Sequence, residues 1–157
     1  MKCLLCDSKS IKRRSGKVRD NESIKILECN NCGFVFLDNQ IHITSDFYQS
    51  SGMHSESLIS LEDWLLETKN DDLRRYKLLH EFLPGNNILD FGSGAGGFLK
   101  MVSEVAKNAI GVELEKRVRD YWSNDLNIIE STKELGNIKF DLITAFHVIE
   151  HVKNPIA

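Results

Sequence analysis

Residues 88–97 decide the fold of this chain, and they read ILDFGSGAGG. The first four residues form a short apolar run with one acid, which is typical of a strand. Glycines recur through the next six positions, and an amphipathic segment begins at Phe98. A strand, a glycine-rich turn and a helix form the first βα unit of a nucleotide-type parallel sheet. Glycines let the backbone approach a ligand closely, and the helix N-terminus offers unpaired N–H groups.

Two acids near this turn narrow the choice of ligand. The glycines, counted from Gly92, also satisfy the G-x-G-x-x-G dinucleotide pattern, so an NAD-dependent enzyme is one interpretation. Asp90, two residues earlier, would repel a pyrophosphate and attract a cationic amino acid group. A second strand, 109–113, ends in Glu113, 21 residues after Gly92, where an acid can accept hydrogen bonds from ribose hydroxyls. These features favour S-adenosylmethionine, which has a cationic end, a ribose and no pyrophosphate.

All four cysteines lie in the first 32 residues, as Cys3-x-x-Cys6 and Cys29-x-x-Cys32. Two C-x-x-C pairs separated by 22 residues predict a zinc ribbon, in which four thiolates surround one ion. Such a complete shell leaves no open position, so the zinc is expected to be structural. The alternatives are two disulfides or free thiols. The N-terminus has no apolar secretion-type segment, which disfavours disulfides.

Composition excludes several classes of protein. The 157 residues carry 20 Lys and Arg against 23 Asp and Glu, and no stretch is as densely basic as a phosphate-binding face requires. We therefore expect no nucleic-acid partner, although a non-enzymatic zinc-ribbon module that contacts nucleic acid is a third interpretation. No run of 18 apolar residues is present, so we expect no membrane span and a cytoplasmic location.

The chain resembles the class I S-adenosylmethionine-dependent methyltransferases. Residues 88–96 are similar to the first motif of that family, and Gly111-Val112-Glu113 is similar to the second. Residues 140–155, FDLITAFHVIEHVKNP, resemble the fourth strand and following turn of a subgroup with an H-V-x-E-H-V-x-x-P signature. A cysteine-rich start before such a domain resembles bacterial sugar C-methyltransferases and related surface-polysaccharide enzymes. The implied fold is α/β, a Rossmann-like class I methyltransferase sheet preceded by a small zinc ribbon.

The resemblance also implies roles for individual residues. Asp90, Gly92 and Gly94 would hold the methionine part of S-adenosylmethionine, and Glu113 would hold the ribose. Leu114 would pack on the adenine, whose polar contact is expected at 130–132. Phe146 and His147 would face the sulfonium and a small, sugar-nucleotide-like substrate. The candidates for a catalytic base are His147, Glu150 and His151, although Glu150 and His151 could equally cap the next helix.

Residues 147–151 also satisfy the H-x-x-E-H pattern of some zinc proteases. That motif requires a helix and a further ligand, whereas here it follows a predicted strand. The pattern therefore lacks the context that a protease zinc site requires.

The remaining elements are predicted from periodicity and turn residues. Further strands are expected at 127–130 and 140–146, and two helices at 58–83 with a break at Asn70-Asp71-Asp72. The predicted domains are a zinc ribbon at 1–45, a helical connector or lid at 46–85 and the first half of a cofactor-binding domain at 86–157.

The family's sheet has seven strands in the order 3-2-1-4-5-7-6, of which this chain would supply the first four. We expect a truncated protein that binds the cofactor weakly without turnover. The alternative is a second chain that supplies the missing C-terminal half. Without the missing strands, strand 140–146 would form an exposed apolar edge.

Overall fold

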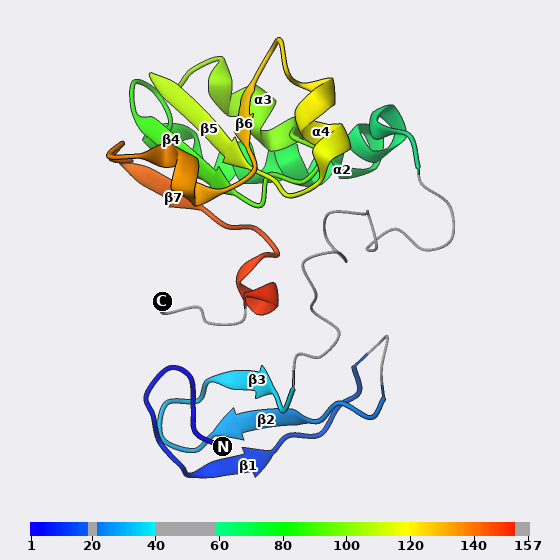
Figure 1. Cartoon of the computed structure of the whole chain (residues 1–157), viewed down its shortest axis with the longest axis vertical. Coiled ribbons are helices and arrows are strands. Elements are labelled where there is room, and N and C mark those ends of the chain that lie inside the picture. The colour runs from blue at the N-terminus through cyan, green and yellow to red at the C-terminus, as the bar shows by residue number, and fades with distance from the viewer. Residues whose placement is uncertain (19–21, 40–58, 153–157) are drawn as a thin grey trace. The chain divides into compact units, whose positions relative to one another are not determined.

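The computed structural model describes residues 1–18, 22–39 and 59–152 (Figure 1). The chain divides into two compact units, which are treated separately below. The first consists of Met1–Thr44 with Ile149–Ala157, and the second of Ser45–Val148.

The first unit contains a three-stranded antiparallel sheet in the order β1-β2-β3. Its strands are β1 (Ile11–Arg13), β2 (Ile26–Cys29) and β3 (Val35–Leu37). In the described part of this unit the buried apolar side chains are Cys3, Ile24 and Cys29. A core of this size is small for a sheet that is held by hydrophobic burial alone.

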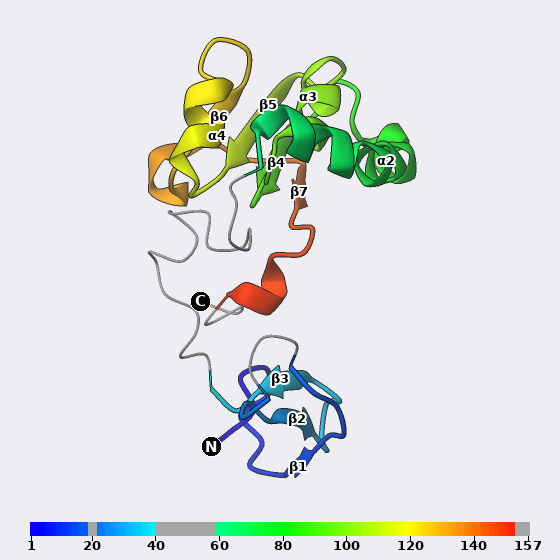
Figure 2. The ribbon, with the colours of Figure 1, turned by 90° about the vertical axis from the view of Figure 1, so that its right-hand side faces the viewer.

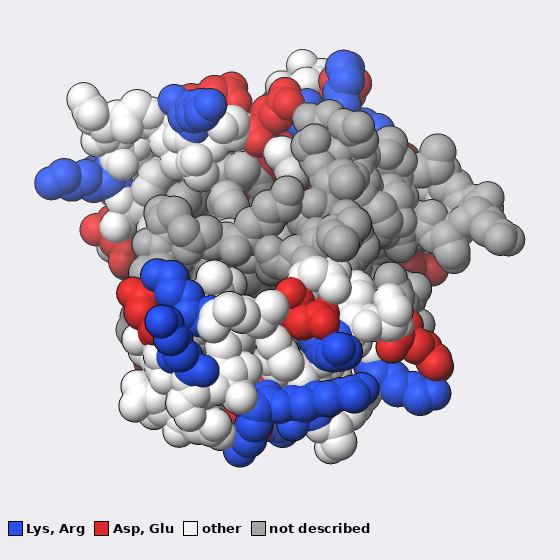
Figure 3. Space-filling model, turned by 60° about the horizontal axis from the view of Figure 1, so that its bottom comes forward, with Lys and Arg blue, Asp and Glu red and all other residues white. Residues whose placement is uncertain are grey.

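Strand β1 forms the charged edge of this sheet. Lys12 and Arg14 both pair with Glu28 on β2, at 3.2 and 2.9 Å, and Lys17 pairs with Glu22 at 2.8 Å. On the face of the molecule drawn in Figure 3, acidic side chains lie among the basic ones. This arrangement is that of a solvated hairpin edge, and the expected absence of a nucleic-acid partner stays a prediction.

The second unit contains a parallel sheet in the order β6-β5-β4-β7. Its strands are β4 (Asn87–Phe91), β5 (Asn108–Val112), β6 (Asn127–Ile129) and β7 (Leu142–Thr144). Counted along the chain this is the order 3-2-1-4, so the α/β prediction and its strand order are confirmed. The last strand is shorter than predicted, because only Leu142–Thr144 pairs with β4.

Helices cover the sheet and complete its core. They are α2 (Leu61–Leu79) continued by the 3-10 turn η1 (His80–Phe82), α3 (Gly97–Ser103), α4 (Lys116–Tyr121) and the 3-10 turn η2 (Thr132–Leu135). Leu83 and Ile88 pack with Phe98 and Val102 of α3 on one face of the sheet. Leu89, Ile110 and Val112 form the cluster on the other face. Helix α4 lies beside β6 (Figure 2), where Val118 packs near Ile128.

The predicted break between two helices at 70–72 is wrong, because α2 runs through it without interruption. Asp71 and Asp72 are poor helix formers, but here each is paired with an arginine one turn ahead. Asp71 forms ion pairs with Arg74, at 2.6 Å, and with Arg75. Asp72 is buried and lies 3.4 Å from Arg75. Helix α2 belongs to the same compact unit as the sheet.

The predicted role of 46–85 as a connector or lid stays a prediction, because residues 46–58 lie outside the described residues. Within the described ranges, no helix is both long enough and apolar enough to cross a membrane.

Candidate functional site: a four-cysteine centre and the carboxyl edge of the parallel sheet

The four cysteines converge in the first unit. Their sulfur atoms all lie within 4.8 Å of one another, with Cys3 and Cys32 3.6 Å apart and Cys6 and Cys29 also 3.6 Å apart. None of the four forms a disulfide. A tetrahedral zinc–thiolate shell with bonds of about 2.3 Å places its sulfurs about 3.8 Å apart. The four side chains therefore fit one zinc ion.

Both cysteine pairs are shaped by the same turn. In the first, the N–H of Asp7 donates to the carbonyl of Cys3 at 3.0 Å, and Asp7 has a φ of 56°. In the second, the N–H of Gly33 donates to the carbonyl of Cys29 at 2.9 Å, and Gly33 has a φ of 74°. The left-handed residue after each pair curls the backbone so that both thiols point inward. Two copies of one local turn thus build the centre.

The ionisation of the thiols also suits a cation. A backbone hydrogen bond from Cys32 lowers the pKa of Cys29 to about 6. Cys32 itself receives a hydrogen bond from the backbone of Phe34, but desolvation and the neighbouring cysteines outweigh it and raise its pKa to about 12. Four sulfurs this close cannot all be thiolates unless a cation lies between them.

The glycine-rich turn of the second unit, residues 92–96, reverses direction through three left-handed glycines. Gly92, Gly94 and Gly96 have φ values of 76°, 54° and 86°. The N–H groups of Gly92 and Ser93 both donate to the carbonyl of Val112, at 2.8 and 3.1 Å. These bonds fasten the end of β4 to the end of β5, where parallel α/β sheets bind their ligands.

Bulky side chains fix this turn from two sides. The indole N–H of Trp122 donates to the carbonyl of Ala95 at 2.8 Å. A Cβ at Gly96 would lie 2.6 Å from the same nitrogen, and one at Gly92 would overlap the side chain of Val148. Glycine is required at both positions by close packing as well as by φ.

Glu113 follows β5 and turns its carboxylate toward the glycine turn. One oxygen accepts from the N–H of Gly94 at 2.8 Å, and the other from the N–H of Glu115 at 2.9 Å. Burial raises the pKa of Glu113, while these two hydrogen bonds lower it in part. Glu113 is therefore held against the glycine turn by two hydrogen bonds.

Asp90 lies inside the sheet rather than on its rim, with 3% of its surface exposed. The parallel register places it beside Thr144 of β7, whose hydroxyl donates to Oδ1 at 2.6 Å. Burial raises the pKa of Asp90 to about 6, and the Thr144 hydrogen bond and the charge of Arg75 oppose this. A buried carboxylate of this kind favours a cationic ligand and disfavours a phosphate.

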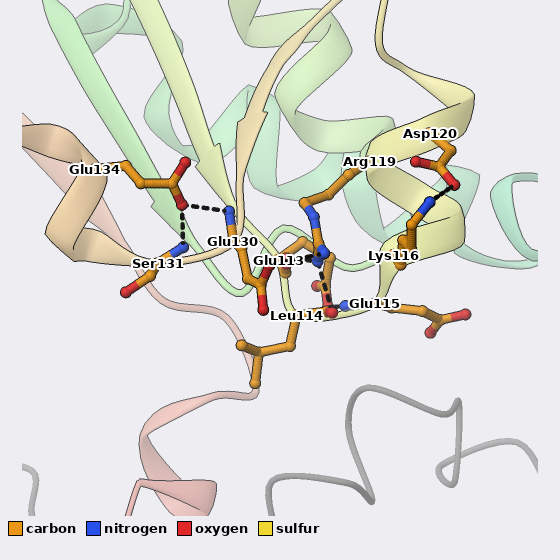
Figure 4. A network of polar contacts seen from close by, with 9 residues as sticks. All are labelled: Glu113, Leu114, Glu115, Lys116, Arg119, Asp120, Glu130, Ser131 and Glu134. Atoms are coloured by element: carbon orange, nitrogen blue, oxygen red, sulfur yellow. Dashed lines mark hydrogen bonds and ion pairs between the residues drawn. The ribbon is translucent and has the colours of Figure 1, made fainter.

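A hollow of about 340 Å³ lies beside the end of β5 and is lined by Leu114, Lys116, Arg119 and Glu130. Figure 4 shows Leu114 and Glu130 together with the polar network around them. Leu114 is 37% exposed, so it offers an apolar surface to a flat ring. Of the predicted positions 130–132, Glu130 is the one that lines this hollow.

Phe146 and His147 lie past the end of β7. The Phe146 ring contacts Phe98 edge-on, with ring centres 5.3 Å apart, and the Arg75 guanidinium lies 4.7 Å from its centre. Phe146 is thus part of the core cluster beneath the site. His147 is exposed and has a φ of 55°, a conformation that costs a non-glycine residue energy.

Glu150 and His151 belong to the 3-10 turn η3 (Ile149–His151), which groups with the first unit. Residues 147–151 therefore do not form the α-helix that a zinc protease motif requires. Among the described residues, the four cysteines are the cluster able to hold a metal.

Sequence reasoning missed three residues of the site. Thr144 bonds Asp90, Arg75 lies over Phe146, and Arg119 links the ends of β5 and β6. The parallel register could have identified Thr144 as a neighbour of Asp90. The other two act through tertiary contacts that leave no signal in the sequence.

Comparison with known proteins places this geometry in a family. A family model described as "Methyltransferase domain" matches residues 65–157, more than half of the chain. The chain is similar to two solved structures of magnesium protoporphyrin IX methyltransferase from Synechocystis PCC 6803, one with bound SAM and one with bound SAH, both at 13% identity. Their TM-scores are 0.46 and 0.45, and the matches cover 73% of this chain and 64% and 61% of theirs. The chain therefore spans less than two thirds of these structures. No curated protein sequence matches.

Because the residues matched by the family model contain most of α2 and the whole parallel sheet, the chain belongs to the methyltransferase-domain family.

Proposed function

We propose that the carboxyl edge of the parallel sheet binds S-adenosylmethionine and that the chain acts as a methyltransferase. The observation that carries this proposal is the pair of acids beside the glycine turn, Asp90, which is buried, and Glu113, which is partly buried and bonded to the N–H of Gly94. A dinucleotide would bring its pyrophosphate to this turn, next to two carboxylates.

Residues of this edge can be assigned to the methionine, ribose and adenine parts of S-adenosylmethionine. Asp90 and the turn at Gly92 and Gly94 would receive the methionine part with its cationic centres. The carboxylate of Glu113 keeps further lone pairs for the ribose hydroxyls while Gly94 and Glu115 hold it in place. Leu114 would pack on the adenine, and Glu130 would accept a hydrogen bond from it.

The bound cofactor would supply a methyl group that is already activated by the sulfonium. The protein then has to position the acceptor in line and remove one proton. His147 is our candidate base, because it is exposed and follows β7 three residues after Thr144, the partner of Asp90. Glu150 and His151 are further candidates for the same step.

For the acceptor we propose a small, nucleotide-linked sugar or a similar molecule used in surface-polysaccharide or glycan biosynthesis. The support is the four-cysteine centre ahead of a methyltransferase sheet, together with the H-V-x-E-H-V-x-x-P pattern. We propose that the cysteines hold a structural zinc, since two are fully buried and the shell is complete.

Calorimetric titration tests the cofactor. We expect the 157-residue chain to bind S-adenosylhomocysteine and to bind NAD at least tenfold more weakly. Glu113→Gln should weaken S-adenosylhomocysteine binding about tenfold or more, because it removes a charged acceptor of hydroxyl hydrogen bonds. Glu104→Gln, at the exposed end of α3, is the matched control and should change nothing. Tight binding of NAD alone would contradict the proposal and support the dinucleotide interpretation.

A further inference from the structure

Arg119 of α4 joins three segments at the hollow beside β5. The two hydrogens of its Nη1 donate to the carbonyls of Glu113 and Leu114, at 2.8 and 2.6 Å. Its Nη2 donates to Oε2 of Glu130 at 3.2 Å. The guanidinium therefore ties the ends of β5 and β6 together, as Figure 4 shows.

The burial of the two partners is unequal. The Arg119 side chain is 17% exposed, whereas that of Glu130 is 52% exposed. A half-exposed glutamate is ordinarily free to change rotamer and point into water. Arg119, which is anchored to two backbone carbonyls, gives the Glu130 carboxylate a fixed partner.

The backbone of Glu130 is fixed as well. The carboxylate of Glu134 accepts from the N–H groups of Glu130 and Ser131, at 3.1 and 2.9 Å, and so completes a capping box. Glu130 is thus held at its backbone by Glu134 and at its carboxylate by Arg119, and it lines the hollow with Leu114.

We propose that Arg119 is a positioning residue that makes the hollow selective for a 6-amino purine over a 6-oxo purine. This inference rests on the proposed cofactor. An ionised carboxylate is an acceptor only, so Glu130 attracts an exocyclic amino group and repels a carbonyl oxygen at the same place. Arg119 acts through Glu130, because it holds Oε2 and leaves Oε1 to meet the base.

The test compares the dissociation constants of S-adenosylhomocysteine and its 6-oxo analogue S-inosylhomocysteine on the same protein sample. The wild-type chain should prefer the amino compound at least about tenfold, as expected for one charge-assisted hydrogen bond. Arg119→Met should bring the ratio of the two constants to within about twofold of one. A variant that merely loses stability weakens both ligands alike and leaves this ratio unchanged.

Three further variants make the result decisive. Glu130→Ala should reduce the ratio as Arg119→Met does, and the double variant should show no additional loss. If Arg119→Met does not fold, Arg119→Lys replaces it, since lysine keeps the charge but cannot hold two carbonyls and a carboxylate together. Arg74→Met removes an exposed arginine–aspartate pair from α2 and should keep the wild-type ratio.

Each outcome decides the matter. A wild-type ratio near one, or a wild-type ratio retained by Arg119→Met, overturns the role of Arg119 while the proposed cofactor stands. A wild-type chain that binds neither compound contradicts the proposed cofactor and this inference with it.

Discussion

At the scale of single residues, the ionised carboxylate of Asp90 would favour binding of a cationic ligand but lowers the stability of the folded protein. It is buried beside Thr144 and has no arginine or lysine close enough to form a described ion pair. Burial raises its pKa to about 6, above the value of about 3.9 in an unfolded chain. Ionised Asp90 therefore costs native stability, and a cationic ligand would offset this cost.

Asp90→Asn should separate these two effects. The cost is absent below about pH 4 and complete above about pH 6, because ionisation of Asp90 destabilises the wild type over this range. The stability of the variant relative to the wild type should therefore increase as pH rises and reach on the order of 3 kcal/mol at pH 8. It should also bind S-adenosylhomocysteine more weakly. Urea unfolding followed by tryptophan fluorescence measures the gain, because both tryptophans, Trp64 and Trp122, lie in the sheet unit. A variant less stable than wild type at pH 8 contradicts the assignment.

At the scale of elements, the strands and turns lie close to the positions that the local sequence predicts. The glycine turn falls where the sequence predicts it, since three left-handed positions in five residues can hardly be built from other residues. Both cysteine turns likewise depend on a few neighbouring residues. The wrong break in α2 has the opposite cause. Asn70-Asp71-Asp72 disfavours a helix locally, but pairing with Arg74 and Arg75 and burial of Asp72 outweigh that preference.

The two cysteine turns, and the small sheet that they join, should stay folded only when zinc is bound. The purified chain should contain about one zinc ion, and chelation should unfold β1–β3, because little apolar surface holds that sheet. Trypsin should then cut at Lys12, Arg13 and Arg14, and added zinc should restore protection. Tryptophan fluorescence should stay unchanged as an internal control. A metal-free chain that resists cleavage in residues 1–39 would exclude the metal as the source of stability.

At the scale of the whole molecule, the sequence was sufficient for the sheet order and for the residues on its carboxyl edge. It was not sufficient for the contacts that hold them. Arg119 and Arg75 are ordinary helix residues in the sequence, and their partners lie on other elements. Phe146, whose predicted role toward the sulfonium stays a prediction, packs edge-on against Phe98 of α3. Side-chain direction after a strand depends on tertiary packing, which local patterns do not encode.

The carboxyl edge of β4 and β5 is proposed to bind S-adenosylmethionine, and amide chemical-shift mapping with S-adenosylhomocysteine tests this binding most directly. We expect the titration to shift the amides of Gly92, Gly94, Leu114, Glu115 and Glu130, which border the glycine turn and the hollow. Amides in residues 1–39 should stay in place. Shifts confined to residues 1–39, or none at the glycine turn, would contradict the account.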